Sequence, residues 1–352
     1  MKPEYVIGAS MFILVVAGLG FVLTRPALEE GGPSGAGTPY VEIVNPSGFV
    51  NTDKPITIGQ FVGKKVILID FLTYSCINCQ RTFPYLNAWY ERYKDEGLEI
   101  IGIHTPEFAF ERDIKNVRTA MEKFGITHPI VLDNDYATWN AYGNRYWPRK
   151  YLIDIHGNIV YDHIGEGAYD KTEQKIRELL AERAEVLGED VYEMGDELAV
   201  AAVSEGKNMA RSPETYFGAH RNEYLGNGIP GRIGELAFIL PETFASNKLY
   251  LGGTWNISQE YAESVASDSA LVYQYHAGEV YIVADADAPV EVEVWQDGMV
   301  VTDAAGEDVQ NGVVIIRESR LYKLIKNETS GEHILQLKVR TKGGRLYAFT
   351  FG

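Results

Sequence analysis

The sequence predicts two folded domains of different class, preceded by one N-terminal transmembrane helix. The first is an α/β domain with a central mixed sheet flanked by helices, and the second is an all-β sandwich. Buried-strand patterns alternate with amphipathic helical patterns in the first half of the chain, as in α/β sheets. The last third contains short runs of period two separated by turn residues, which is typical of antiparallel sandwiches. Residues 5–23 are uncharged, almost wholly apolar and long enough to cross a bilayer.

Composition limits the class of protein. The 352 residues suffice for two domains of ordinary size. Hydrophobic residues make up 45% and charged residues 23% of the chain, as in globular proteins. The formal net charge of −17 argues against a nucleic-acid partner. Two cysteines are too few for a structural disulfide framework, so cysteine use indicates catalysis.

The apolar N-terminal segment is interpreted as an uncleaved membrane anchor. Lys2 precedes it, which weakly favours a cytoplasmic N-terminus with the remainder outside the cytoplasm. A cleaved signal peptide is the alternative, but no small-x-small pattern ends the apolar run. A linker rich in Gly and Pro follows, and its composition predicts a flexible spacer. The expected division is a transmembrane anchor at 1–24, a linker at 25–45, an α/β domain at 46–185, a connector at 186–215 and a β-sandwich at 216–352.

The α/β domain begins with a buried strand at Val66–Leu72, which leads into a helix at 80–93. Asp170 and Glu173 fit a capping box at the start of the last helix. His156-Gly157 is a turn signal between two strands. Further strands are expected at 99–104, 129–132, 151–154 and 158–163, and further helices at 113–124, 136–142 and 170–184.

Cys76 and Cys79 stand where the first strand meets its helix. Unpaired N–H groups and the helix dipole would stabilise a thiolate at Cys76, and Cys79 lies one turn deeper, where it can close a disulfide. No second cysteine pair exists to complete a zinc site, and Gln80 stands where haem attachment requires His. Metal binding with distant histidines and two buried, inert thiols remain as alternatives. We favour a dithiol/disulfide centre with no metal and no other cofactor.

Further motifs resemble a known family. Asp70 and Pro84 stand where thioredoxins have a buried acid and a helix-kinking proline. The segments Thr-Tyr-Ser-Cys-Ile-Asn-Cys-Gln-Arg at 73–81, Gly-Ile-His-Thr-Pro-Glu-Phe at 102–108 and Tyr-Trp-Pro-Arg-Lys-Tyr-Leu-Ile-Asp at 146–154 resemble the thioredoxin-like (TlpA/redoxin-like) domain of DipZ-type membrane-anchored proteins. The resemblance runs from about residue 49 to 180 and resumes near the C-terminus. It implies a thioredoxin-like fold and a thiol-disulfide oxidoreductase, with reduction as the preferred direction.

The proposed chemistry assigns a role to each candidate residue. Cys76 attacks a substrate disulfide and Cys79 resolves the mixed disulfide. Asp70 lies in an apolar run, so burial should raise its pKa and let it exchange a proton with Cys79. The alternative interpretation of Asp70 is that its side chain points to a polar edge of the sheet and is not buried. The resemblance implies a cis peptide at Pro148, which leaves the backbone of Trp147 free to pair with a substrate strand. Further substrate contacts are expected from the two residues before Cys76, which are Tyr74 and Ser75.

Other polar residues have weaker interpretations. The two histidines that flank apolar strands, His104 and His128, are expected to be structural. Glu107 and Phe108 are candidates for the rim of the active site. A thiol peroxidase is a rival function, because a Thr stands three residues before Cys76 as in peroxiredoxins. However, the proline expected four residues earlier is absent, and Cys79 would trap the thiolate as a disulfide.

The C-terminal part resembles the carbohydrate-binding-module-like domain of DipZ-type proteins in the segments 212–218, 253–256 and 348–352. Strands are expected at 271–276, 279–284, 290–295, 321–325, 334–340 and 346–351. Sugar binding would require exposed aromatic side chains, and the candidates are Trp255, Tyr261, Tyr273 and Trp295. Aromatic residues in a sandwich are more often core or cross-strand pairs, so docking of proteins or a spacer role is preferred over glycan binding.

The resemblance also implies location and partners. It predicts a single-pass cell-membrane protein whose catalytic part is extracytoplasmic, at the periplasm or cell surface, and acts on disulfide-containing protein substrates. The full DipZ architecture has a multi-helix electron-delivering domain, so this chain would need a separate membrane electron donor of the CcdA/DsbD type. Ile77-Asn78 replaces the Gly-Pro of thioredoxin, so the redox potential cannot be carried over. A non-enzymatic surface protein that binds a ligand or glycan through the sandwich is the alternative.

Overall fold

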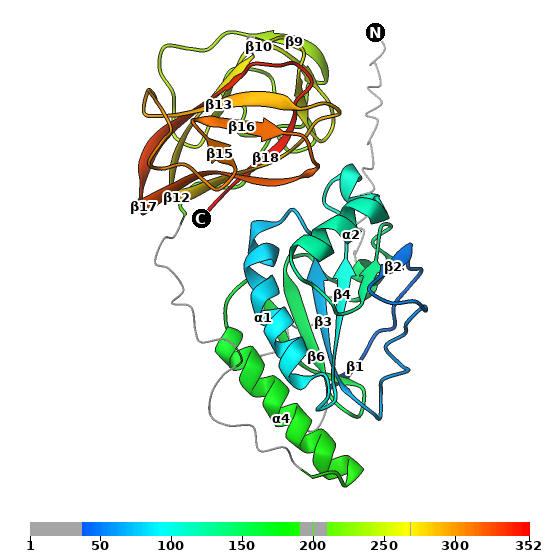
Figure 1. Cartoon of the computed structure of the whole chain (residues 1–352). Coiled ribbons are helices and arrows are strands. Elements are labelled where there is room, and N and C mark those ends of the chain that lie inside the picture. The colour runs from blue at the N-terminus through cyan, green and yellow to red at the C-terminus, as the bar shows by residue number, and fades with distance from the viewer. Residues whose placement is uncertain (1–36, 191–198, 200–209, 268) are drawn as a thin grey trace, which may run out of the picture.

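The computed structural model describes residues 37–190, 199, 210–267 and 269–352. Figure 1 shows an α/β domain and a C-terminal β domain, which lies beyond the end of the mixed sheet where α1 (Ile77–Tyr93) begins. The expected transmembrane segment lies outside the described residues, as do residues 191–198 and 200–209 of the expected connector. Within the part of the chain that is described, no helix is long and apolar enough to span a membrane.

The first domain is built on a seven-stranded sheet with the order β1-β7-β6-β3-β4-β5-β2. Strands β3, β4 and β5 are parallel, β6 is antiparallel to β3, and β7 is antiparallel to β6. This arrangement confirms the predicted mixed sheet and is a thioredoxin-like fold. Its elements are β1 (Thr38–Pro39), β2 (Gly48–Val50), β3 (Val66–Leu72), α1 (Ile77–Tyr93), β4 (Leu98–His104), the 3-10 helix η1 (Ala109–Arg112), α2 (Ile114–Lys123), β5 (Ile130–Leu132), α3 (Ala137–Ala141), β6 (Arg149–Ile153), β7 (Asn158–Ile164) and α4 (Tyr169–Leu187).

Strand β3 is buried on both faces, as its continuous apolar run predicted. Successive side chains of a strand point to opposite faces. Leu68 and Leu72 therefore join one core with residues of α1, α2 and α4. Ile69 and Phe71 join a second core on the other face, which α3 helps to cover. Asp70 has the same parity as Leu68 and Leu72, so it lies on the face that α1 covers.

The folded domain starts earlier than residue 46. Thr38 and Pro39, inside the stretch expected to be a linker, form β1 and pair with β7. The carboxylate of Glu42 accepts hydrogen bonds from the backbone N–H groups of Ile58 (2.7 Å) and Gly59 (3.0 Å). Residues 38–42 therefore belong to the α/β domain, because distant strands and loops supply their partners.

The predicted capping box of α4 is wrong. The helix begins at Tyr169 with Ala168 as its N-cap, so Asp170 lies within the first turn. Glu173 is instead one turn inside the helix and buried. Its carboxylate accepts hydrogen bonds from Trp89 Nε1 (2.9 Å) and the Tyr93 hydroxyl (2.6 Å). Because α4 starts earlier than predicted, the side chain of Glu173 faces α1, and its hydrogen bonds connect the two helices.

The C-terminal domain consists of antiparallel strands, as predicted. The path of the sheet is β15-β16-β13-β17-β12-β10-β11-β18-β8, and β12 also pairs with β18. The long strand β12 pairs with β10 through its first part and with β18 through its last part, so the sheet folds around one apolar core. The strands are β8 (Thr215–Tyr216), β9 (Gly234–Phe238), β10 (Leu249–Ile257), β11 (Ala262–Ser264), β12 (Ala270–Asp285), β13 (Val290–Gln296), β14 (Met299–Val300), β15 (Val309–Gln310), β16 (Val313–Ile316), β17 (Arg320–Val339) and β18 (Arg345–Phe351).

The aromatic residues proposed as a sugar platform are mostly unavailable. Trp255 and Tyr273 are both fully buried in the core of the β domain, so their assignment as exposed candidates is wrong. Both keep a polar partner: Trp255 Nε1 donates to the carbonyl of Gly252 at 2.9 Å, for example. Trp295 is partly exposed, but Lys338 Nζ lies 3.6 Å from a ring centroid of its indole. Alternate side chains of a strand point to the same face of the sheet, and at Trp255 and Tyr273 that face is the apolar core, which their large rings help to fill.

The carboxylate of Glu173 should contribute strongly to stability. Glu173→Ala leaves two buried donors on α1 without an acceptor, so we expect the free energy of unfolding to fall by about 2–4 kcal/mol. The exposed Asp170, three residues before Glu173 in the same helix, is the control: Asp170→Ala should change the free energy of unfolding by no more than about 0.5 kcal/mol. Urea unfolding followed by tryptophan fluorescence measures both. Equal losses in the two variants would contradict this account.

Candidate active site

The two cysteines lie at the start of α1. Cys76 is the N-cap residue, with extended backbone (φ −77°, ψ 122°), and its side chain is partly exposed. Cys79 is one turn further on and fully buried. Both are free thiols. Burial raises the pKa of Cys79 well above its usual value, and a hydrogen-bonding contact with Cys76 raises it further. One sulfur is therefore accessible, and its neighbour is a protonated thiol in contact with it.

Glu111 of η1 holds the loop that leads to Cys76. Its buried carboxylate accepts hydrogen bonds from the hydroxyls of Thr73 (2.5 Å) and Ser75 (2.7 Å) and from the Ser75 backbone N–H (3.2 Å). The other oxygen accepts from the backbone N–H groups of Glu107 (2.7 Å) and Phe108 (3.0 Å). One side chain therefore joins the loop after β3 to the loop after β4. Sequence reasoning missed Glu111, because its partners are distant in the chain and no periodicity marks it.

Tyr74 and Ser75 were expected to contact substrate, but both are buried. Ser75 is held by Glu111, as described above. The hydroxyl of Tyr74 donates to the backbone carbonyl of Ser319, in the second domain, at 3.0 Å. Neither side chain is available to a substrate in this structure, so the structure gives them the task of fixing the loop. The sequence motif marked the right loop but could not show that a second domain covers it.

Asp70 lies under α1 and is fully buried, so the alternative of a polar edge is excluded. Neither of its carboxylate oxygens has a hydrogen-bond partner among the described residues. Burial raises the pKa of Asp70 to about 7, although the positive charge of Lys150 opposes this effect. A negative charge on Asp70 in turn raises the pKa of Cys79. The two groups are thus electrostatically coupled, as exchange of a proton between them requires.

Lys150 is a site residue that the sequence did not reveal. It stands opposite Asp70 in the register of β3 and β6, so both side chains leave the sheet on the same face. Lys150 is buried, and Nζ has one long hydrogen bond, to the carbonyl of Gly165 at 3.5 Å. Burial lowers its pKa, whereas Asp70 and Cys79 raise it. The run Arg-Lys-Tyr-Leu-Ile in β6 suggested an ordinary strand, and only the pairing with β3 identifies its lysine as part of the site.

The peptide bond between Trp147 and Pro148 is cis, as the family resemblance implied. The indole N–H of Trp147 donates to the carbonyl of Thr105 at 3.1 Å, and its ring lies against Trp139 with centroids 4.4 Å apart. The carbonyl of Pro148 accepts from the N–H of Gly165 at 2.8 Å. The loop before β6 is therefore anchored on both sides of the cis bond.

The remaining candidates have mainly structural surroundings. His104 and His128 are fully buried, and burial lowers the pKa of His104 to about 3 and that of His128 to about 4. Both are therefore neutral near pH 7. Glu107 lines a cavity, described below, and Phe108 is buried between the domains. In the part of the chain that the structure describes, no group of three or more His, Cys, Asp and Glu side chains could hold a metal ion.

The second domain covers one side of the site. Ile77, the residue after Cys76, packs in an apolar cluster with Tyr281, Val283 and Leu321. Arg81 of α1 forms an ion pair with Glu279 at 3.2 Å. Ile77 is therefore not free to contact a substrate, and this face of the Cys-x-x-Cys segment is closed.

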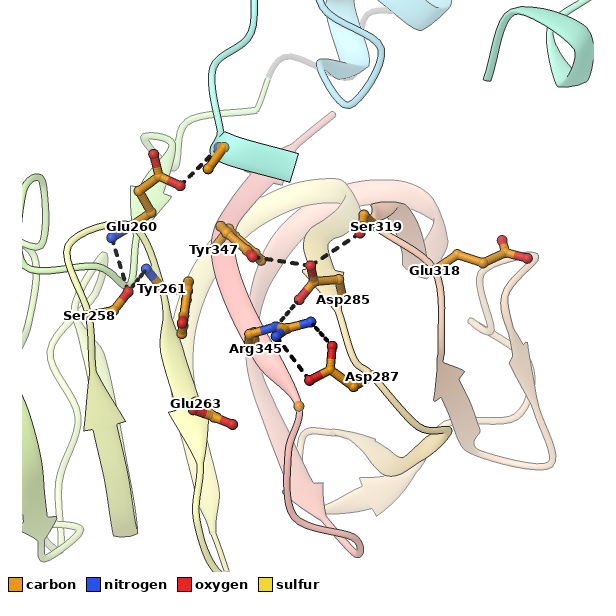
Figure 2. Close-up of polar contacts among 12 residues, drawn as sticks. Ser258, Glu260, Tyr261, Glu263, Asp285, Asp287, Glu318, Ser319, Arg345 and Tyr347 are labelled. Atoms are coloured by element: carbon orange, nitrogen blue, oxygen red, sulfur yellow. Dashed lines mark hydrogen bonds and ion pairs between the residues drawn. The ribbon is translucent and has the colours of Figure 1, made fainter. Parts of the chain in front are cut away.

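A polar network stiffens the covering surface. Figure 2 shows Asp285 at its centre, where the carboxylate accepts hydrogen bonds from the Ser319 hydroxyl (3.1 Å), the Tyr347 hydroxyl (3.2 Å) and Arg345 Nε (2.5 Å). Arg345 also binds Asp287 at 2.8 Å. Because Ser319 carries the carbonyl that accepts from the active-site loop, this network fixes the acceptor of the contact between the domains.

Each of the two domains matches a known protein family. Residues 46–180 match the redoxin family, and residues 212–352 match the family described as thioredoxin like C-terminal domain. Protein DipZ of Mycobacterium tuberculosis is 36% identical over 87% of this chain, which spans only 42% of DipZ. Thiol-disulfide oxidoreductase YkuV of Bacillus subtilis is 28% identical over 41% of this chain and 95% of its own length. Thiol-disulfide oxidoreductase ResA of Halalkalibacterium halodurans is 34% identical over 36% of this chain and 65% of its own length.

The carboxyl of Asp70 should make stability depend on pH. Its pKa rises from 3.8 to about 7 on folding, so between those values the folded chain holds a proton that the unfolded chain releases. Wild-type stability therefore falls as pH rises through this window. Asp70→Asn cannot ionise, so its stability relative to wild type should rise by up to roughly 4 kcal/mol between pH 4 and pH 7. Urea unfolding at several pH values measures this. The exposed Asp95→Asn is the control, and a flat difference for Asp70→Asn would contradict the burial argument.

The charge of Lys150 should tune the same carboxyl. Lys150→Met removes a positive charge that lowers the pKa of Asp70, so the titration midpoint of Asp70 should move up by about one pH unit. NMR of carboxyl-labelled aspartate measures the midpoint. The exposed Lys171→Met provides a control with the same loss of charge. A midpoint that moves down, or moves equally in both variants, would show that Lys150 does not act on Asp70.

Proposed function

We propose that this chain, a homologue of DipZ with a redoxin domain and a thioredoxin-like C-terminal domain, is an extracytoplasmic thiol-disulfide oxidoreductase that acts as a reductase of protein disulfides. The observation that carries the proposal is the accessible sulfur of Cys76 in contact with the protonated thiol of Cys79. An accessible thiol with a buried partner one turn away is the arrangement that two-step disulfide exchange requires. The oxidoreductase names of YkuV and ResA support the same activity.

The reaction proceeds in two exchanges. The thiolate of Cys76 attacks one sulfur of the substrate disulfide, forms a mixed disulfide and expels the other substrate sulfur as a thiolate, which takes up a proton. Cys79 then loses its proton to the Asp70 carboxylate and attacks the sulfur of Cys76. This step forms the Cys76–Cys79 disulfide and releases the second substrate thiol. The substrate gains two electrons and two protons, and the protein is oxidised. A pKa of about 7 lets Asp70 accept and return a proton near neutral pH.

The loop at Trp147 and Pro148 is proposed to hold the substrate. The cis bond turns the chain just before β6, and Trp147 packs against the apolar cluster that also contains Cys76 and Cys79. An extended segment of substrate can add its backbone to that of Trp147 as a strand adds to a sheet edge. Main-chain pairing of this kind accepts many sequences, which suits an enzyme that reduces different proteins.

The oxidised pair must be reduced again. We propose that a separate membrane protein of the CcdA/DsbD type supplies the two electrons and that residues 1–24 anchor the chain beside it. The uncharged stretch at 5–23 supports the anchor. An extracytoplasmic location is consistent with the chemistry, since protein disulfides persist in oxidising compartments.

Peroxidase activity has less support. A peroxidatic site would need the hydroxyl of Thr73 to face the thiolate. That hydroxyl donates to Glu111 at 2.5 Å and serves the loop instead. The proximity of Cys79 also favours a disulfide over an oxidised sulfur that persists. Glycan binding is supported by only partly exposed aromatic residues, of which Trp295 already contacts Lys338.

The roles of the two cysteines can be separated by substitution. Cys76→Ser should abolish reduction of a peptide disulfide, because no accessible nucleophile remains. Cys79→Ser should still attack, but it should accumulate a mixed disulfide because resolution is blocked. Mass spectrometry of the trapped adduct and turnover with a dithiol reductant measure both. Unchanged turnover in Cys76→Ser would contradict the mechanism.

The direction of electron flow is tested by the reduction potential of the pair in thiol buffers. A reductase should lie toward the thioredoxin value of about −270 mV. A value near −120 mV, typical of a strong oxidant, would make the chain a disulfide donor.

A further inference from the structure

A cavity of about 270 Å³ lies between the two domains, beside the cis-proline loop. The α/β domain contributes Trp147 and Glu107 to its wall, and the β domain contributes Tyr216, Arg221 and Glu260. None of the cysteines lines it. The loop proposed to hold the substrate and a part of the second domain therefore both line this cavity. The disulfide-exchange steps described above give the cavity no role.

We propose that this cavity is a specificity subsite that binds a basic side chain, lysine or arginine, of the substrate polypeptide near its disulfide. The proposal rests on the disulfide-reductase function proposed above and adds the class of substrate to it. The C-terminal domain then forms the second wall of the substrate site.

The position of the cavity follows from the proposed substrate path. Trp147 immediately precedes the cis-proline, and its side chain lines the cavity. A substrate segment that pairs with the backbone of Trp147 therefore carries neighbouring side chains to the opening. Approach from the opposite side is closed, because the β domain covers Ile77. The substrate disulfide and the cavity are then bound by the same short segment of chain.

The charges of the wall favour a cation. Arg221 forms an ion pair with Glu107 at 2.8 Å and stacks over the ring of Tyr216 at 3.5 Å, so these two charges satisfy each other. Glu260 has no cationic partner among the described residues; one of its oxygens accepts from the backbone N–H of Ala109 at 3.0 Å. Its second oxygen has no hydrogen bond within the described chain. The wall thus carries one uncompensated carboxylate next to aromatic rings, a combination that attracts ammonium and guanidinium groups.

Glu260 is held in place before any substrate arrives. Figure 2 shows the Ser258 hydroxyl accepting from the backbone N–H groups of Glu260 (3.2 Å) and Tyr261 (3.1 Å). The neighbouring segment packs tightly against this turn: a Cβ at Gly218 would lie 2.2 Å from the carbonyl carbon of Glu260. A carboxylate that is already ordered loses little conformational entropy when it binds a ligand, so little of the binding free energy is spent on ordering it.

The test compares three peptide disulfides that carry Lys, Ala or Glu two residues from the reacting cysteine. The full-length chain should reduce the Lys peptide with a kcat/KM about tenfold higher than the Glu peptide, with Ala between them. Glu260→Gln keeps an oxygen that can accept from Ala109 but removes the charge. It should lower kcat/KM for the Lys peptide by about three- to tenfold and leave kcat/KM for a small, uncharged disulfide such as 2-hydroxyethyl disulfide unchanged.

Two further variants sharpen the result. Glu260→Lys should reverse the order of the three peptides, and thermal unfolding shows whether it remains folded. Glu235→Gln removes an exposed carboxylate of β9, outside the cavity, and should leave the order unchanged.

The outcomes separate this inference from the function on which it rests. Equal kcat/KM for all three peptides in the wild type, or an equal loss for every substrate in Glu260→Gln, would overturn the basic subsite while leaving the reductase intact. Failure of the wild type to reduce even the small disulfide would overturn the proposed function as well.

Discussion

The exclusion of water beneath α1 is the constraint on which the site depends. A carboxyl, an amine and a thiol, from Asp70, Lys150 and Cys79, lie there within one apolar core. In water near pH 7 the carboxyl and the amine would be charged, and the thiol would be mostly neutral. Burial disfavours every charged form, so the carboxyl and thiol hold protons more tightly and the amine holds its proton less tightly. The proton of any one group therefore depends on the others, as the proposed proton exchange between Asp70 and Cys79 requires.

The two domains share one site. The loop before Cys76 is held from inside its own domain by Glu111 and from outside by Ser319. The covering domain buries Ile77, one of the two residues between the cysteines. It leaves open the side where Trp147 and the cavity lie. A C-terminal module that looks like an appended binding domain in sequence thus closes one side of the Cys-x-x-Cys segment, and it would limit the paths open to the proposed substrate.

Local patterns were reliable where they reflect backbone geometry or burial of a continuous apolar run. The strand β3, the helix after the cysteines and the hairpin of β6 and β7 follow from such patterns. The predicted capping box failed because several starting points for α4 fit the sequence, and contacts with α1 choose among them. Two of the four aromatic candidates of the β domain, Trp255 and Tyr273, failed similarly, because both lie in the core. A pattern of period two shows that alternate residues share a face, but it does not show which face is buried.

The sequence by itself determined the dithiol, its place at a helix N-terminus and the buried acid six residues before it, because these depend on spacing and on one hydrophobic run. The family resemblance added the cis-proline. Only the tertiary structure decided the partners of these groups. Lys150 reaches the site through the register of β3 and β6, Glu111 through a turn 35 residues beyond Cys76, and Glu260 through the packing of a second domain. Each contact joins residues that are far apart in the chain, so no local pattern could contain it.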